Sequence, residues 1–118
     1  MIKINELRVG NWIDLVNPMS DEPNFHQYDV TDDYINIEAY GEPIRINRIF
    51  LVNIGFVTPV KMCDTVFFKD KIMLDFHNGV YKLRDFGTVI SSVHELQNIY
   101  YAINYRELEI NINTLWGK

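Results

Sequence analysis

Apolar residues in the first third of the chain come in short runs that polar turns separate. Short runs between turn residues are typical of β-strands. We therefore predict strands over residues 11–16, 25–30 and 34–39, and in the last of these Ile35 and Ile37 alternate with polar neighbours. Three such strands would form an antiparallel sheet or a small open barrel.

From Asn47 onward the apolar spacing becomes helical for one or two turns. Asn47 has a side chain suited to an N-cap, and Gly55 stands where a helix commonly ends in a left-handed residue. The pattern predicts one short helix between them.

The next segment is rich in β-branched and aromatic residues and predicts a β-meander. Asn78-Gly79 is typical of a type I′ hairpin turn, because both residues tolerate positive φ angles. Lys69-Asp70-Lys71 marks a second tight turn. The predicted strands are residues 65–69, 72–77, 80–84 and 87–90.

The clearest predicted helix begins after Ser92. Ser92 and Glu95 have the spacing of a capping box, in which each side chain satisfies a free backbone N–H at the helix start. The apolar residues that follow share one face at about 100° per residue. They are Val93, Leu96, Ile99, Tyr100 and Ile103. Residues 107–116 then alternate again and predict a final strand.

These elements predict an α+β fold: an antiparallel sheet or small open barrel, a β-meander, one short helix, and a capped C-terminal helix packed on the sheet. The length of 118 residues is that of one domain, and no stretch resembles a linker. We therefore expect a single domain over residues 1–118.

Charge is distributed unevenly along the chain. The formal net charge is −5, and the stretch between Val9 and Ile44 contains eight carboxylates but no Lys or Arg. These eight are Asp14, Asp21, Glu22, Asp29, Asp32, Asp33, Glu38 and Glu42. Such a surface is expected to meet a cationic partner, either a basic protein surface or a metal ion. It argues against direct binding to nucleic acid, which requires clustered Lys and Arg.

Cysteine usage and hydropathy favour a cytoplasmic protein. The single cysteine, Cys63, permits no internal disulfide, which fits a reducing compartment. Residues 1–6 lack the apolar run of a secretory signal, and no apolar stretch reaches the roughly 20 residues that cross a bilayer. We therefore expect no membrane partner.

Two segments of the chain resemble a family of small uncharacterised proteins of Bacteroidota phages and prophages. They are Glu6-Leu7-Arg8-Val9-Gly10-Asn11-Trp12-Ile13 and His94-Glu95-Leu96-Gln97-Asn98-Ile99-Tyr100-Tyr101-Ala102. Ile54-Gly55-Phe56 is also similar to the middle of the family, whereas Asn104-Tyr105-Arg106-Glu107-Leu108 departs from its usual Thr-Gly-Glu-Glu-Leu. The resemblance implies a phage or prophage origin, and hence the host cytoplasm as location, but it implies no activity.

The late helix carries a second face of hydrogen-bonding and aromatic side chains. By the same periodicity this stripe comprises His94, Gln97, Asn98, Tyr101 and Tyr105. Two interpretations are open. The stripe either contacts a partner through rigid rings and amides, or packs under the N-terminal strands or the C-terminal tail as a satisfied polar layer.

No motif for catalysis, a metal or a cofactor emerges from the sequence. Asp29, Asp32 and Asp33 do not have the spacing of a calcium loop. The glycines form no phosphate-binding loop. The histidines and the cysteine match no zinc or nucleophile motif; these residues are His26, His77, His94 and Cys63. We predict no catalytic residue, no metal and no cofactor.

The sequence therefore predicts a non-catalytic protein–protein interaction module, in the form of a phage-encoded accessory protein that binds and modulates a host protein. A basic partner would be steered by carboxylates and held by late-helix side chains. The predicted contact residues are Asp29, Asp32, Asp33, Glu38, Gln97, Tyr101 and Tyr105.

Other functional classes stay open at this point. One is a protein that sequesters a nucleotide signal, whose phosphates would need donors such as Arg45, Arg48, Lys82 and Arg84. Another is a virion or assembly component that self-associates as a homo-oligomer. An enzyme is the least favoured, because it would need a pocket that joins His94 or His77 to a carboxylate or to Cys63.

Overall fold

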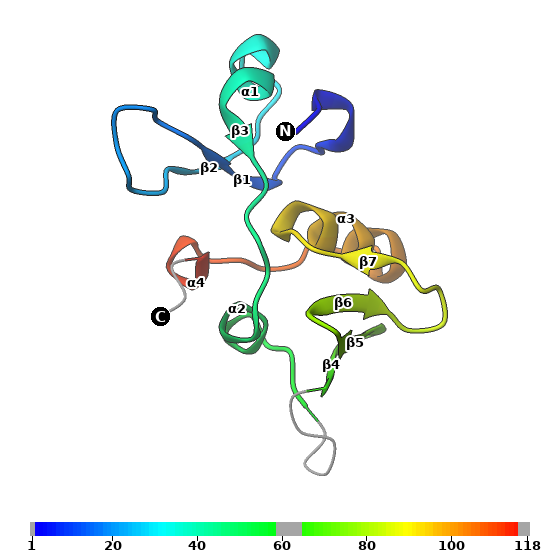
Figure 1. Cartoon of the computed structure of the whole chain (residues 1–118). Helices are drawn as coiled ribbons and strands as arrows, with labels where there is room; N and C mark the ends of the chain where they lie inside the picture. The colour runs from blue at the N-terminus through cyan, green and yellow to red at the C-terminus, as the bar shows by residue number, and fades with distance from the viewer. Residues whose placement is uncertain (1, 59–64, 116–118) are drawn as a thin grey trace.

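The computed structural model describes residues 2–58 and 65–115 of the 118-residue chain. The molecule is elongated, with extents of 45 × 30 × 25 Å (Figure 1). In chain order its elements are η1 (Ile4–Glu6), β1 (Trp12–Leu15), β2 (Phe25–Gln27), α1 (Tyr34–Tyr40), β3 (Gly41–Glu42), α2 (Arg48–Asn53), β4 (Val66–Lys69), β5 (Ile72–His77), β6 (Val80–Leu83), β7 (Val89–Ile90), α3 (Val93–Asn104) and α4 (Ile112–Leu115).

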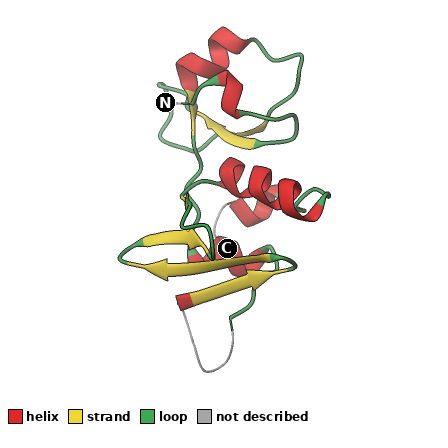
Figure 2. Cartoon of the chain, turned by 90° about the vertical axis from the view of Figure 1, so that its right-hand side faces the viewer, coloured by secondary structure: helices red, strands yellow, loops and turns green. Residues whose placement is uncertain are grey.

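Two antiparallel sheets organise these elements. The first has the strand order β2-β1-β3, and the second has the order β4-β5-β6-β7. Over the described residues neither sheet closes into a barrel. Helix α3 lies between the two sheets (Figure 2). The predicted α+β fold class is thus confirmed.

Buried hydrophobic residues form two clusters. Ile2, Ile13 and Ile37 make a small cluster within residues 2–42, which we call the N-terminal lobe. A larger cluster occupies the remaining described residues from 44 onward, which we call the C-terminal lobe; its members include Phe50, Phe67, Leu74, Leu96 and Tyr100. Trp12 and Phe25 of the N-terminal lobe pack against this larger cluster, so the two lobes share apolar contacts.

The strand predicted over residues 34–39 is wrong, because this segment is helix α1. The side chain of Asp33 caps the helix by accepting a hydrogen bond from the N–H of Ile35 at 3.0 Å. Ile37 is buried whereas Ile35 is 63% exposed, so the two isoleucines do not share one face. The third strand of the sheet is β3, directly after the helix.

The final strand predicted over residues 107–116 is also wrong. In the described part of this tail the chain is irregular and then forms the short helix α4. Leu108 and Leu115 are buried in the larger cluster, so the apolar residues of the tail pack individually and not as a strand face. Trp116 lies outside the described residues, as does Cys63.

Local signals in the rest of the chain are confirmed. Asn47 caps α2 by accepting from the N–H of Phe50 at 2.8 Å, and Gly55 follows with φ +103°. Asn78 and Gly79 both have positive φ at the β5–β6 turn. The Ser92 hydroxyl caps α3 by accepting from the N–H of Glu95. These signals act within a few residues, so sequence alone reveals them.

Candidate functional site

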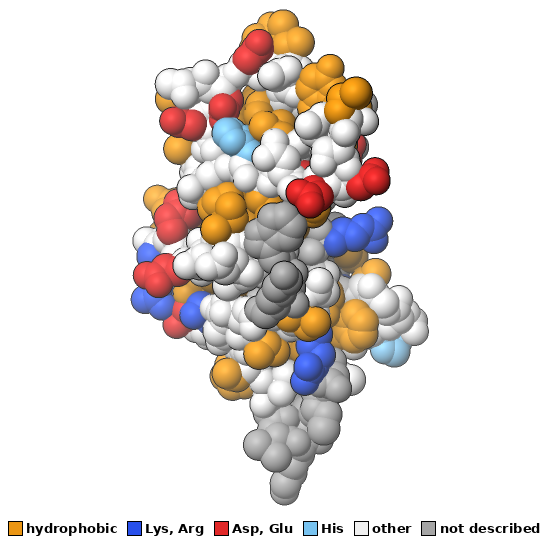
Figure 3. All heavy atoms as spheres, turned by 90° about the vertical axis from the view of Figure 1, so that its left-hand side faces the viewer, with side chains coloured by type: hydrophobic (Ala, Val, Ile, Leu, Met, Phe, Trp, Pro, Cys, Tyr) orange, Lys and Arg blue, Asp and Glu red, His pale blue; other side chains and the backbone are white. Residues whose placement is uncertain are grey.

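The N-terminal lobe is rich in carboxylates. Residues 1–42 contain nine carboxylates and only two basic residues, Lys3 and Arg8. Figure 3 shows acidic side chains spread over this lobe, with apolar side chains between them. At neutral pH such a surface attracts cationic groups over distances of about a Debye length, close to 10 Å.

The carboxylates predicted to steer a partner also hold the lobe together. Asp33 caps α1, and the carboxylate of Glu38 accepts from the N–H of Ile4 at 2.9 Å. Asp29 accepts from the N–H of Val30. The fold therefore fixes the positions of these carboxylates.

Asp32 is the most strongly engaged of these acids. One of its oxygens lies 2.8 Å from Nε2 of His26 and accepts from the N–H of Asp29 at 2.8 Å. Burial by itself raises the pKa of Asp32, but the contacts with His26 and Asp29 outweigh it and bring the pKa below its ordinary value. Asp32 is thus ionised at neutral pH and ties β2 to the loop before α1.

Exposed apolar side chains are interspersed with the acids of this lobe. Met19 is 91% exposed and Val30 is 74% exposed. The exposed set is Val9, Val16, Met19, Val30, Tyr34, Ile35 and Tyr40. A groove of about 310 Å³ between the end of β1 and α1 is lined in part by Val16, Pro18 and Tyr40. Exposed apolar area among polar groups is typical of a protein contact surface.

Two carboxylates of the lobe face each other across neighbouring strands. Asp14 of β1 and Glu42 of β3 are direct partners in the antiparallel pairing. Like charges in this position destabilise a sheet, and between Val9 and Ile44 there is no Lys or Arg to offset them. The lobe therefore retains negative charge at a cost in stability.

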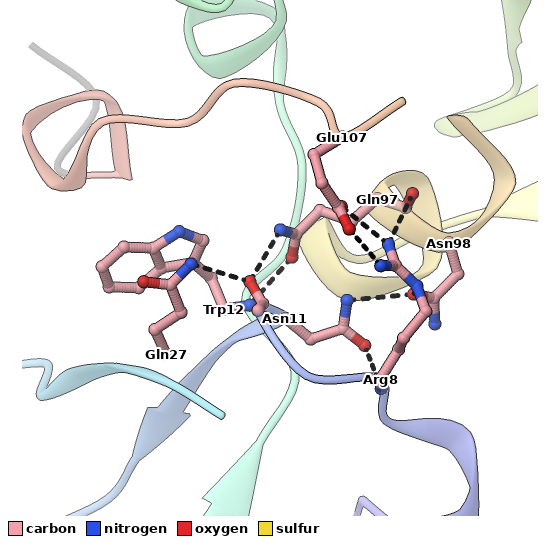
Figure 4. A network of polar contacts seen from close by, with 8 residues as sticks. Arg8, Asn11, Trp12, Gln27, Gln97, Asn98 and Glu107 are labelled. Atoms are coloured by element: carbon pink, nitrogen blue, oxygen red, sulfur yellow. Dashed lines mark hydrogen bonds and ion pairs between the residues drawn. The ribbon is translucent and has the colours of Figure 1, made fainter. Parts of the chain in front are cut away.

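The late-helix stripe is divided between the interior and the surface. His94 and Gln97 are buried, whereas Tyr101 is 42% and Tyr105 is 83% exposed. The Gln97 side chain accepts from the N–H of Trp12 at 2.8 Å and donates to the carbonyl oxygen of Gly10 at 3.0 Å (Figure 4). Its amide serves backbone groups at the start of β1, where the short strand β3 pairs only with Asp14 and Leu15. Gln97 thus belongs to a satisfied polar layer and is not available to a partner.

Arg8 and Asn98 extend this layer across the lobe junction (Figure 4). Asn98 Oδ1 accepts from Nε of Arg8 at 3.2 Å and from Nδ2 of Asn11 at 2.9 Å. The guanidinium of Arg8 also donates to both carboxylate oxygens of Glu107 and lies 4.4 Å from the ring centre of Tyr101. One face of Tyr101 is therefore covered by Arg8, and its remaining surface borders the junction.

The two segments that carry the family resemblance meet at this junction. Residues 6–13 contact residues 94–102 through the bonds that Arg8, Asn11, Gln97 and Asn98 make. These residues join the lobes. For Gln97 and Asn98 this is the second interpretation of the late-helix stripe, a satisfied polar layer against the N-terminal strands. The sequence analysis did not assign a role in this layer to Arg8 or Asn11.

The basic residues considered for a nucleotide site lie apart. Arg84 is held by the carboxylate of Asp75, with contacts of 3.1 and 2.5 Å. Lys82 is exposed and alternates along β6 with buried Tyr81 and Leu83, so it lies on the outer face of the sheet. Arg45 instead lines a cavity of about 140 Å³ with Tyr81 and Ile90, and Arg48 acts electrostatically on Tyr81. These donors therefore lie on both faces of the sheet.

The described residues contain no group of three or more His, Cys, Asp or Glu side chains placed to hold a metal ion. The three histidines are separate: His26 contacts Asp32, His77 is exposed at the end of β5, and His94 lies beside Ser92 and Glu6. Within residues 2–58 and 65–115, no helix has the length and apolar character that crossing a bilayer requires.

Comparison with known proteins gives no relative. No protein-family model, no curated protein and no solved structure matches the chain.

Proposed function

We propose that this chain is a non-catalytic protein-binding module whose N-terminal lobe docks on a basic surface of another protein. The observation that carries the proposal is the surface of this lobe. Its carboxylates surround exposed apolar side chains, and the segment between Val9 and Ile44 contains no Lys or Arg. The carboxylates would orient the encounter, because charge complementarity raises association rates and excludes wrong partners.

Short-range contacts would come from the apolar side chains of the same lobe. Val16 and Tyr40 border the groove between β1 and α1, and Met19 extends from the adjacent loop. Apolar anchors contribute most of the binding free energy at typical interfaces, whereas exposed rim charges contribute little. The partner surface is therefore expected to combine Lys or Arg side chains with an apolar side chain that enters the groove.

We extend the proposal to a phage accessory protein that modulates a host protein by occupying its basic surface. The resemblance of residues 6–13 and 94–102 supports this origin. The separation of Arg45 from Lys82 and Arg84 gives less support to the sequestration of a nucleotide, since bound phosphates need several donors at one place.

The test requires a partner and two charge-matched variants. Protein captured from host lysate is identified by mass spectrometry, purified, and titrated against the chain at low and high salt. Asp21→Asn with Glu42→Gln removes two exposed carboxylates of the N-terminal lobe. Asp85→Asn with Glu109→Gln removes two from the C-terminal lobe and serves as control.

The proposal predicts that the lobe variant binds the purified partner several-fold more weakly and with a shallower salt dependence, while the control variant binds like wild type. If both variants lost affinity equally, binding would depend on the net charge of the chain and not on the position of the carboxylates, which would contradict the proposal. A captured partner with an acidic surface, or binding that salt does not weaken, would contradict the proposal.

A further inference from the structure

A cavity of about 480 Å³ lies where the two lobes meet. It is lined by Glu6 at the end of η1, by Pro43 between the lobes, by Val89 of β7, and by His94 and Glu95 in the first turn of α3. This volume falls within the range of about 300–1,000 Å³ that is usual for small-ligand pockets.

The charged groups that line this cavity are acidic. Glu6 and Glu95 contribute carboxylates, and no Lys or Arg of residues 2–58 and 65–115 lines it. The start of α3 is not free to bind an anion, because the carboxylate of Glu95 already accepts from the N–H of Ser91 at 3.2 Å and from the hydroxyls of Ser91 and Ser92 at 2.8 Å. The cavity therefore favours a cationic occupant.

The hydrogen bonding of His94 gives an independent reason to expect a cationic occupant. Its side chain is 5% exposed and lies between Ser92 and Glu6. The single hydroxyl hydrogen of Ser92 is directed to Glu95, which is the nearer and charged acceptor. In the tautomer that carries its hydrogen on Nδ1, His94 donates to Ser92 Oγ over 3.2 Å.

In the neutral ring Nε2 is then an acceptor, yet its neighbour is the Glu6 carboxylate at 3.4 Å. Two acceptors thus face each other at the cavity wall. A cationic donor placed between them would satisfy both. The charged groups that line the cavity with His94 are Glu6 of η1 and Glu95 of α3.

We propose that this cavity holds the guanidinium group of an arginine side chain from the basic partner. The guanidinium donates to the Glu6 carboxylate and to Nε2 of His94, and its planar fork suits a carboxylate. The aliphatic stem lies along Pro43, Val89 and Ile99. This inference rests on the proposed function, because it names one side chain by which the partner is held.

The experiment is an NMR titration with a small probe in place of the partner. Nα-acetyl-arginine amide is added to the isotope-labelled chain at low salt, and Nα-acetyl-citrulline amide, its uncharged isostere, is the matched ligand. Saturable shifts are expected at the backbone amides of residues 89–99 and at the His94 ring with the arginine compound only.

Two variants separate a direct role of Glu6 from a general effect of charge. Glu6→Gln is expected to weaken the probe several-fold, while Glu22→Gln, in an exposed loop of the same lobe, leaves its affinity unchanged. Equal binding of the citrulline compound, equal effects of the two variants, or an absence of saturable shifts at the cavity would overturn the inference.

The outcomes for the cavity and for the lobe are distinguishable. If the purified partner binds the lobe as proposed but the arginine probe does not bind, the cavity assignment fails and the docking function stands. If the probe binds while no basic partner is found, the docking function fails and the cavity remains a site for cations.

Discussion

Single residues at the lobe junction carry a large share of the fold's specificity. Gln97 satisfies the N–H of Trp12 and the carbonyl of Gly10 from a buried position more than 80 residues along the chain. An unpaired buried backbone group costs free energy comparable to a lost hydrogen bond. The side chain of Gln97 therefore stabilises the start of β1 against helix α3.

Replacement of Gln97 by Ala is expected to lower the free energy of unfolding by about 1–3 kcal/mol, because it removes the acceptor for the N–H of Trp12 and one of the two side-chain donors to the carbonyl of Gly10. Gln27 offers a matched control, since it also donates to Gly10 but is exposed to solvent. Gln27→Ala is expected to cost less than about 0.5 kcal/mol. Urea unfolding measures both, and equal losses would contradict the role assigned to Gln97.

The local residue signals were predictable from sequence, but these junction contacts were not. Asn47, Ser92 and Asn78-Gly79 act on backbone groups within three residues, so their chemistry determines their structure. The partners of Arg8, by contrast, are Asn98 and Glu107, at separations of 90 and 99 residues. No periodicity in the sequence connects positions so far apart.

Among the elements, α1 shows why a short apolar pattern misleads. Alternation of Ile35 and Ile37 predicted a strand, yet seven residues are too few to separate a period of 2 from one of 3.6. Two features stabilise the helix: Asp33 caps its first turn, and Ile37 is buried against Ile13 and Ile2. The helix ends at Gly41, where a side chain would not fit because a Cβ would collide with the carbonyl oxygen of Ile37.

The pairing of β1 with β3 provides a test at the scale of the sheet. Glu42→Gln is expected to raise the free energy of unfolding by about 0.2–1 kcal/mol, because it removes the like charge opposite Asp14. Glu22→Gln removes the same charge from an exposed loop and controls for net charge. A gain in both variants, or in neither, by urea unfolding would show that the cross-strand repulsion is not significant.

At the scale of the whole molecule, the sequence shows that the carboxylates are concentrated in one segment, but it does not show which of them are exposed. The absence of Lys and Arg between Val9 and Ile44 places the charge on one lobe in any fold that keeps this segment together. Which carboxylates are exposed depends on contacts such as those of Asp32 with His26 and of Glu38 with Ile4. Those contacts also fix the apolar side chains between the acids.

The central claim, that the N-terminal lobe is the docking surface, is tested most directly by hydrogen exchange of the chain with and without its purified partner. Protection on binding is expected at backbone amides of residues 14–42, with β4 to β6 of the C-terminal lobe unchanged. Protection confined to the second sheet, or absent from residues 14–42, would contradict the claim and move the binding surface to the other lobe.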